Sequence, residues 1–181
     1  MVAVKRKFVR IGAVLLSVST LLAGCTAHTK VDKIESIKDQ SYTSDPRSIS
    51  IVQGKSVILG DVIRNTLVTG MLECGATAEF LPIDNYKDKD FYKKSDSILQ
   101  VEKLIGTRST NGYIAYASTY EITLQDIKSG TNVWRFRMEL LEAAPTDPIT
   151  KQLRGEPDAR VVWANAVLAQ MKKDGIFSSC K

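Results

Sequence analysis

Residues 116–140 carry the strictest pattern in this chain: two runs of alternating apolar and polar side chains with a short turn between them. One face of the first run is formed by Tyr116, Ser118, Tyr120, Ile122 and Leu124. The matching face of the second run is formed by Trp134, Phe136, Met138 and Leu140. A period of two is typical of strands that bury one face, and the turn between them contains Ser129-Gly130. The pattern therefore predicts an antiparallel hairpin that packs on a core through one face.

Two other segments have the spacing of helices. Across residues 56–74 the apolar positions recur every three or four residues: Leu59, Ile63, Leu67, Met71 and Cys74. Ser56 is the expected N-cap of this helix, and Gly75 the expected residue after its end. A second helix is predicted over 158–174, with Asp158 at its start and Gly175 after its end. Ile176 and Phe177 are expected to fold back onto its last turn.

The remaining β-like segments complete a fold prediction. Strands are expected over 33–38, 78–83 and 98–105, the last with Leu99, Val101 and Ile105 on one face. The predicted order is β-α-β-β-β-β-α. We interpret this order as one α+β domain over 34–181, a mostly antiparallel sheet with two helices packed on one face.

The first 25 residues have the features of a targeting segment. A basic stretch ending at Arg10 precedes a 12-residue apolar run, Ile11–Leu22, which is too short to span a bilayer as a helix. The run ends in Leu22-Ala23-Gly24-Cys25, which resembles the lipobox of bacterial lipoproteins. We therefore expect a signal peptide over 1–24, acylation of Cys25 with chains such as palmitate, and a tether over 25–33. An uncleaved N-terminal helix or a plain secreted protein are the alternatives.

The resemblance to a lipobox also implies a location. In lipoprotein sorting of the enterobacterial kind, Asp after the acylated cysteine favours retention in the inner membrane, and this chain has Thr26 there. The resemblance therefore implies the outer membrane, with the domain facing the periplasm, if the source is Gram-negative.

The charge balance argues against nucleic acid as a partner. The 181-residue chain has a formal net charge of +5, but four of its 25 basic residues lie in the first ten positions: Lys5, Arg6, Lys7 and Arg10. Without residues 1–24 the chain has 21 basic and 20 acidic residues. A nearly neutral mature chain lacks the basic surface that DNA or RNA binding requires.

Two cysteines remain after Cys25 is acylated. Cys74 and Cys180 would lie in an oxidising compartment, where an even pair predicts a disulfide. Such a bond would tie the C-terminal tail to the end of the first helix. The alternative is two free thiols, with Cys74 packed as a small apolar residue.

No catalytic or metal-binding motif stands out, and we expect no cofactor. The one histidine, His28, lies in the predicted tether. Gly54-Lys55-Ser56 resembles the end of a phosphate-binding loop but lacks its first glycine, because position 49 is Ile49. Asp84, Asp88 and Asp90 have the spacing of a calcium loop without its glycine or its final glutamate.

The outward face of the hairpin is the best candidate for a working surface. Glu121 and Glu139 there could be an acid/base couple, but Arg135 and Arg137 beside them favour a ladder of surface charges. We predict that Glu121, Arg135, Arg137 and Glu139 contact a partner, with the loop 84–94 as the next candidate.

The hairpin also carries a resemblance to a family. Tyr120–Leu124, Asp126, Ser129-Gly130 and Val133-Trp134, after a lipobox and before a helix ending in Asp174-Gly175, resemble a group of small periplasmic lipoproteins. Their α+β domain is similar to the N-terminal domain of the translocation protein TolB, and the group includes the curli-secretion lipoprotein CsgG and the polysaccharide-export lipoprotein PelC. Members of this group bind proteins or assemble into rings at the envelope and are not enzymes.

The resemblance implies a lipid-anchored, non-enzymatic accessory protein of envelope transport or assembly. Its expected partner is an envelope protein or a second copy of the chain. The alternative is a lipoprotein that captures a glycan or a lipid on the outer face of the sheet.

Overall fold

A computed structural model describes residues 29–43, 45–54, 57–81, 94–108, 114–143 and 157–180. At residues 107, 108, 114–116 and 143 it describes the backbone only. The predicted signal peptide and Cys25 lie outside the described residues. Six strands form one sheet in the order β1-β6-β5-β4-β2-β3. Their bounds are β1 Lys30–Lys38, β2 Ser48–Gln53, β3 Thr77–Phe80, β4 Ser97–Arg108, β5 Ile114–Asp126 and β6 Asn132–Ala143.

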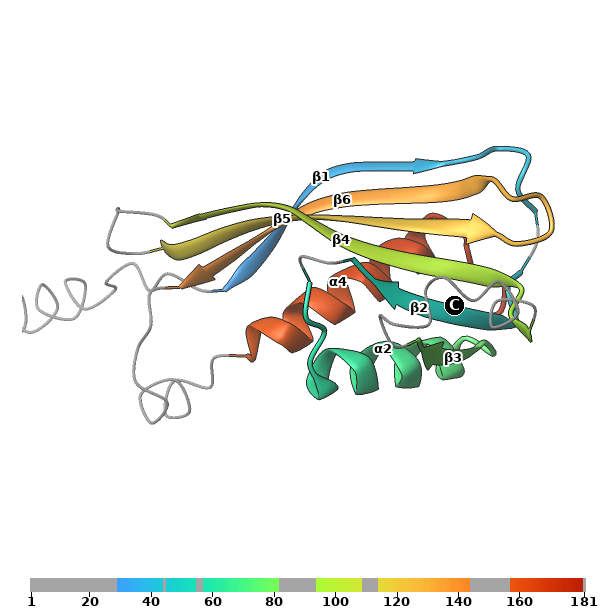
Figure 1. Cartoon of the computed structure of the whole chain (residues 1–181), viewed down its shortest axis with the longest axis horizontal. Helices are drawn as coiled ribbons and strands as arrows, with labels where there is room; N and C mark the ends of the chain where they lie inside the picture. Colours follow the sequence, from blue (N-terminus) through green and yellow to red (C-terminus); the bar gives the residue numbers. More distant parts are fainter. Residues whose placement is uncertain are drawn as a thin grey trace, which may run out of the picture.

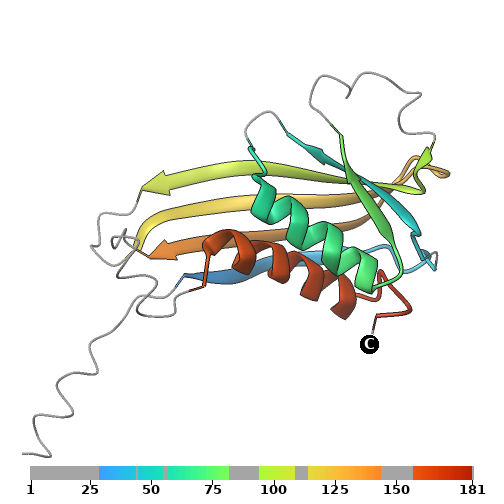
Figure 2. The same cartoon turned by 90° about the horizontal axis from the view of Figure 1, so that it is seen from below.

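Two helices, α2 (Asp61–Glu73) and α4 (Ala159–Lys173), cover one face of this sheet. They lie side by side and run in the same direction, whereas neither of the described helices lies on the opposite face of the sheet (Figures 1 and 2). The α+β class and the placement of both helices on one face are as the sequence predicts. Among the described helices, none is long and apolar enough to cross a membrane.

The sheet contains parallel as well as antiparallel pairs, and the sequence prediction missed one of its parallel strands, β2. β2 pairs in parallel with both β3 and β4, so β2, α2 and β3 form a β-α-β unit. The polar and apolar residues of β2 alternate only over Ser48–Ile51, and Ile49, Ser50, Ile51 and Val52 are all buried. The alternating signal is short, and the parallel position of the strand, buried on both faces, depends on its neighbours in the sheet.

The first helix begins later than predicted. Ser56 lies outside the described residues, and α2 starts at Asp61 after Gly60 as its N-cap. Just before the helix, the Leu59 amide donates a hydrogen bond to the Gln53 side chain at the end of β2. The second helix matches its prediction, with Asp158 as N-cap accepting a hydrogen bond from the Arg160 amide.

The hairpin β5–β6 has the predicted faces. Ile122 and Leu124 of β5, with Trp134, Phe136 and Met138 of β6, are at most 2% exposed beneath the helices. Tyr120 meets the buried Trp163 of α4 edge to face, with ring centroids 5.6 Å apart. The turn contains Gly130 at φ +71°, a conformation that favours glycine.

Two β-bulges divide the sheet into a body and an end that we call the arm. They lie in β1 between Lys33 and Glu35 and in β4 between Lys103 and Ile105, and they flank the row that contains Met138 and Tyr120. The arm comprises residues 30–34, 104–108, 114–120 and 138–143, and its strands extend past the N-terminal end of α4 (Figure 1). The bulge in β4 reverses the side on which the following residues lie. Ile105 is therefore 60% exposed, and its predicted place beside Leu99 and Val101 is wrong.

The C-terminal tail closes the structure at the other end of the helices. Gly175 has a φ of +68°, after which Ile176 and Phe177 are buried, as predicted. A disulfide joins Cys74 and Cys180 with their Cα atoms 4.7 Å apart, consistent with the predicted pairing. The Ser179 hydroxyl also donates to the carbonyl of Cys74. The tail is thus fastened to the end of α2.

Asp174 links the end of α4 to the sheet. Its carboxylate accepts hydrogen bonds from Ser36 of β1, from Nε1 of Trp134 at 2.8 Å and from Nε2 of Gln170 at 2.8 Å. Burial alone raises the pKa of Asp174, but these donors outweigh burial, and its pKa is lowered below the ordinary 3.8. The ionised carboxylate therefore stabilises the folded state.

Candidate functional site

The candidate site is the face of the sheet that lies away from the helices. Alternation along β5 and β6 places Glu121, Arg135, Arg137 and Glu139 on this face, as predicted, and each side chain is partly exposed. The register brings Glu121 directly opposite Arg137, and Thr123 directly opposite Arg135. The four predicted residues therefore share one surface of the hairpin.

One row of charges crosses four strands. The register aligns Glu102 of β4, Glu121 of β5, Arg137 of β6 and Glu35 of β1 as successive neighbours. Arg137 Nη2 lies 2.6 Å from Glu121 Oε2, and Arg135 Nη2 lies 3.3 Å from Glu35 Oε1. The Glu121 side chain is only 21% exposed, so the pair is partly shielded from water.

The two arginines differ in their surroundings. The hydrogen bond and the charge of Glu121 raise the pKa of Arg137, with a smaller contribution from Glu35. Arg137 Nε is buried and has no hydrogen-bond acceptor among the described residues. Arg135 is slightly more exposed, with 41% of its side chain accessible against 35% for Arg137. The two arginines therefore differ mainly in their glutamate partners and in the buried Nε of Arg137.

Carboxylates outnumber the basic groups on this face. Glu102 stands opposite Glu121, and Glu139 stands opposite Asp32, so two pairs of like charges lie across neighbouring strands. Like charges directly opposite one another destabilise a sheet. Gln100 donates to Glu102, and Lys30 pairs with Asp32 at 3.0 Å, which offsets part of the repulsion. The face is left with an acidic excess around Arg137.

A hollow of about 280 Å³ lies at the edge of the same face. Its lining includes Ile37, Thr123 and Arg135, with Asp39 and Asn132 at the turn end. The volume is close to the lower end of the range for small-molecule sites. The alternative prediction, capture of a glycan or a lipid on the outer face, requires a hollow of this kind.

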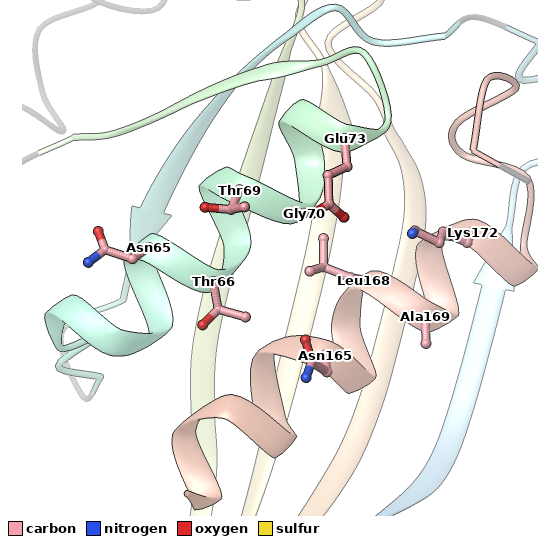
Figure 3. Close-up of a pocket in the computed structure, with 9 residues that line it drawn as sticks. All are labelled: Asn65, Thr66, Thr69, Gly70, Glu73, Asn165, Leu168, Ala169 and Lys172. Atoms are coloured by element: carbon pink, nitrogen blue, oxygen red, sulfur yellow. The ribbon is translucent and has the colours of Figure 1, made fainter.

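A larger groove lies between the two helices, on the side away from the sheet. Its volume is about 500 Å³ (Figure 3). Short polar side chains line it, Asn65, Thr66 and Thr69 from α2 and Asn165 from α4. The helices approach closely here, because a Cβ on Gly70 would come within 2.2 Å of a methyl group of Leu168. The groove is therefore shallow over its middle and polar along its walls.

Several predicted residues cannot be placed. Cys25, His28, Ser56 and the loop residues 84–93 lie outside the described part of the chain. Tyr120 belongs to the core side of the hairpin, as predicted. Residues 30–33 of the predicted tether are in β1, so the tether ends at Thr29. Within the described ranges, no three Asp, Glu, Cys or His side chains come together as a metal site.

Two residues of the charged row were missed from the sequence. Glu35 lies in the segment predicted as the first strand, and Glu102 lies in the predicted strand 98–105. Glu102 alternates with the buried Leu99 and Val101, so its outward direction was accessible to the same periodicity. Glu35 shares its face with the exposed Ile37 while the polar Ser36 faces the helices, so periodicity did not place it. The alignment of both with Arg137 and Glu121 was not accessible to it, because that alignment depends on the order of strands in the sheet.

The structure thus defines an α+β domain with a mixed sheet, two helices on one face and a charged open face. No protein-family model matches the sequence, and the search of curated proteins gives no match. Solved structures similar to this one include the PelC dodecamer from Paraburkholderia phytofirmans, at 10% identity and a TM-score of 0.46, over 77% of this chain and 96% of that one.

Two further similar structures are lipoproteins. One is from Neisseria meningitidis, at 13% identity and a TM-score of 0.41, over 71% of this chain and 99% of that one. The other is a minor lipoprotein from Acinetobacter baumannii, at 13% identity and a TM-score of 0.37, over 71% of this chain and 94% of that one. Likenesses at these scores do not indicate what the chain binds. The resemblance to TolB and CsgG and the acylation of Cys25 stay predictions.

Proposed function

We propose that this chain is a lipid-anchored, non-enzymatic accessory protein of cell-envelope transport or assembly, held at the outer membrane and facing the periplasm. It acts by contact, through the outer face of the sheet. The observation that carries the proposal is the charged row from Glu35 to Glu102, on the face that neither of the described helices covers. The order of basic, apolar and small residues up to Cys25 supports the anchor.

The charges on this face indicate the chemistry of the partner. Glu102 and Glu121 lie opposite one another on neighbouring strands, and Arg137 forms its ion pair with Glu121. A basic side chain from a partner would relieve the repulsion between the two carboxylates. The expected partner is therefore an envelope protein, or a second copy of the chain, that presents lysine or arginine to this row.

A charge exchange tests the proposal without changing the composition. Glu121→Arg combined with Arg137→Glu preserves the pair and the net charge but reverses its direction. We expect this variant to melt within a few degrees of the wild type and to fail to complement a deletion strain for envelope integrity. Wild-type complementation by the exchanged variant would contradict the proposal and make the loop 84–94 the next candidate.

A matched control is available on the helix layer. Glu73 and Lys172 face the same groove from α2 and α4 (Figure 3). Glu73→Lys with Lys172→Glu exchanges opposite charges on the far side of the molecule and should complement fully, whereas its failure would favour the groove as the working surface. The molar mass of residues 26–181 from light scattering then identifies the partner: an oligomer indicates a second copy of the chain, and a monomer indicates another protein.

The anchor has its own test. Cys25→Ala should remove the protein from the membrane fraction and leave an uncleaved or soluble precursor. Incorporation of labelled palmitate equally in both proteins would contradict the anchor, whatever the outcome of the charge exchange.

A second candidate function is the capture of a small polar ligand. The groove between α2 and α4 favours it, because amides and hydroxyls from both helices line its walls. Such groups suit a glycan better than a lipid. Asn65→Ala with Asn165→Ala should then abolish binding of peptidoglycan fragments or oligosaccharides in calorimetry, with the sheet-face exchange as a control that keeps binding.

A further inference from the structure

The distance between the predicted anchor and the sheet is short. β1 begins at Lys30, five residues after Cys25, and not near residue 34 as the sequence prediction had it. Whatever conformation these residues take, five residues reach at most about 18 Å. If Cys25 carries acyl chains, the Lys30 end of the sheet is therefore held close to the lipid headgroups.

The arm is the part of the sheet at this end. β1 starts there, and β4, β5 and β6 extend beyond the N-terminal end of α4 beside it (Figure 1). Of the six exposed large apolar side chains in the described ranges, three belong to the arm, namely Ile34 at 52%, Leu104 at 43% and Ile105 at 60%. Two of these are the extra residues of the bulges, so the bulges themselves turn apolar groups outward.

The other surfaces fit a membrane less well. The outer face of the sheet body carries Glu35, Glu102 and Glu121 against Arg135 and Arg137, and no large apolar group of its centre is exposed. The groove between the helices is lined largely by polar side chains, and the turn at the far end contains Lys128, Ser129 and Thr131. The described side chains of the arm include two exposed lysines, Lys30 and Lys33, and the carboxylates Asp32, Glu139 and Glu142, so its exposed apolar side chains, and not its net charge, distinguish it.

We propose that the arm is a membrane-docking surface, with Leu104 and Ile105 lying against the lipid that holds the acylated Cys25. The proposal rests on the anchor in the proposed function. It has a consequence for the partner, because the charged row lies four residue pairs beyond Lys30. At about 3.3 Å for each pair, added to the reach of the tether, the row stays within about 30 Å of the headgroups. A partner bound to the row therefore lies within about 30 Å of the membrane surface at its point of contact.

Two equally exposed positions allow a matched experiment. Ile105 in the arm is 60% exposed, and Leu72 near the end of α2 is 61% exposed. Each is replaced by cysteine, Ile105→Cys or Leu72→Cys, in the full lipidated protein, labelled with an environment-sensitive fluorophore and placed in phosphatidylethanolamine–phosphatidylglycerol vesicles. The vesicles carry a nitroxide quencher in the headgroup region. We expect loss of fluorescence and a blue shift at position 105, and neither at position 72.

A longer tether sharpens the result. Insertion of about ten Gly and Ser residues after Thr29 adds some 15–20 Å of average reach. The quenching at position 105 should fall, since the anchor no longer holds the arm at the surface. Replacement of Leu104 and Ile105 by serine in a protein labelled at Lys33→Cys should lower quenching there too, with an unchanged melting temperature.

The outcomes separate the two proposals. Equal quenching at positions 105 and 72, or stronger quenching at 72, overturns the docking of the arm and leaves the anchor intact. Failure of the wild type to float with vesicles overturns the anchor and the docking together. Loss of complementation by the charge exchange bears on the partner surface alone. Shielding of position 105 by a second protein copy, without quenching by lipid, also overturns the proposal.

Discussion

The two faces of the hairpin β5–β6 come from one alternating pattern but have different physical roles. Trp134 is 1% exposed beneath the helices, whereas its neighbour Arg135 has 41% of its side chain accessible on the opposite face. The inner face is held by packing, so a lost atom leaves a cavity. The side chains of the outer face contact water and form exposed ion pairs, so most substitutions there change the free energy of unfolding little. The difference separates residues needed for folding from residues free to serve a function.

The largest effect is expected from a change on the inner face. Trp134→Ala removes a buried ring and the hydrogen bond from its Nε1 to Asp174. We expect a loss of about 3–5 kcal/mol in the free energy of unfolding, measured by urea denaturation. A loss below about 1 kcal/mol would show that the helices do not pack on this face as described.

The disulfide keeps the inner face covered, and its removal should have the next largest effect. Cys74→Ala with Cys180→Ala frees the tail from α2 and should cost about 2–4 kcal/mol. The same double variant is the control for reduction. Dithiothreitol should lower the melting temperature of the wild type and leave that of the double variant unchanged. A wild type that does not respond to reductant, with both thiols accessible to alkylation, would contradict the bond.

Asp174, which links the end of α4 to the sheet, should make the stability of the fold depend on pH. Its pKa is lowered in the folded protein, so its contribution to stability is present well above pH 3.8 and is lost as the pH falls through the folded value. Asp174→Asn should lower stability by about 1–3 kcal/mol at pH 7, and the gap to the wild type should close in acid. Asp32→Asn, at an exposed pair, is the control and should run parallel to the wild type. A gap that is constant from pH 7 to pH 3 would refute the role of the charge.

The smallest effects are expected on the outer face, where the two arginines should differ. Arg137→Glu places a third carboxylate beside Glu121 and Glu35 and should lower the melting temperature measurably. Arg135→Glu, in a more exposed position, should cost less than about 0.5 kcal/mol. Equal melting temperatures for the two single variants would mean that the Arg137–Glu121 pair contributes nothing measurable.

Periodicity predicted the elements that bury one face and missed the one that buries two. The hairpin, its turn and the second helix agree with the sequence prediction because each carries its own period and its own end signals. β2 alternates only over Ser48–Ile51, and α2 starts at Asp61, five residues after the N-cap expected at Ser56. The side of the sheet on which Ile105 lies depends on a bulge, which local sequence did not reveal.

The candidate site was predicted in its residues but not in its arrangement. Alternation alone places Glu121, Arg135, Arg137 and Glu139 on one surface. The addition of Glu35 and Glu102, and the pairing of each arginine with a particular glutamate, required the strand order. The acidic excess around Arg137 is a property of that order and of no single segment.

Local sequence by itself determined the two faces of the hairpin, the second helix, the candidate anchor at Cys25 and the cysteines available for pairing. These features depend on residues within a few positions of one another, where side-chain period and backbone preference act directly. Tertiary structure alone decided the parallel place of β2, the row of charges and the position of the arm at the start of β1. Each of these brings together segments far apart in the chain, and which segments meet is selected by the burial of the whole core.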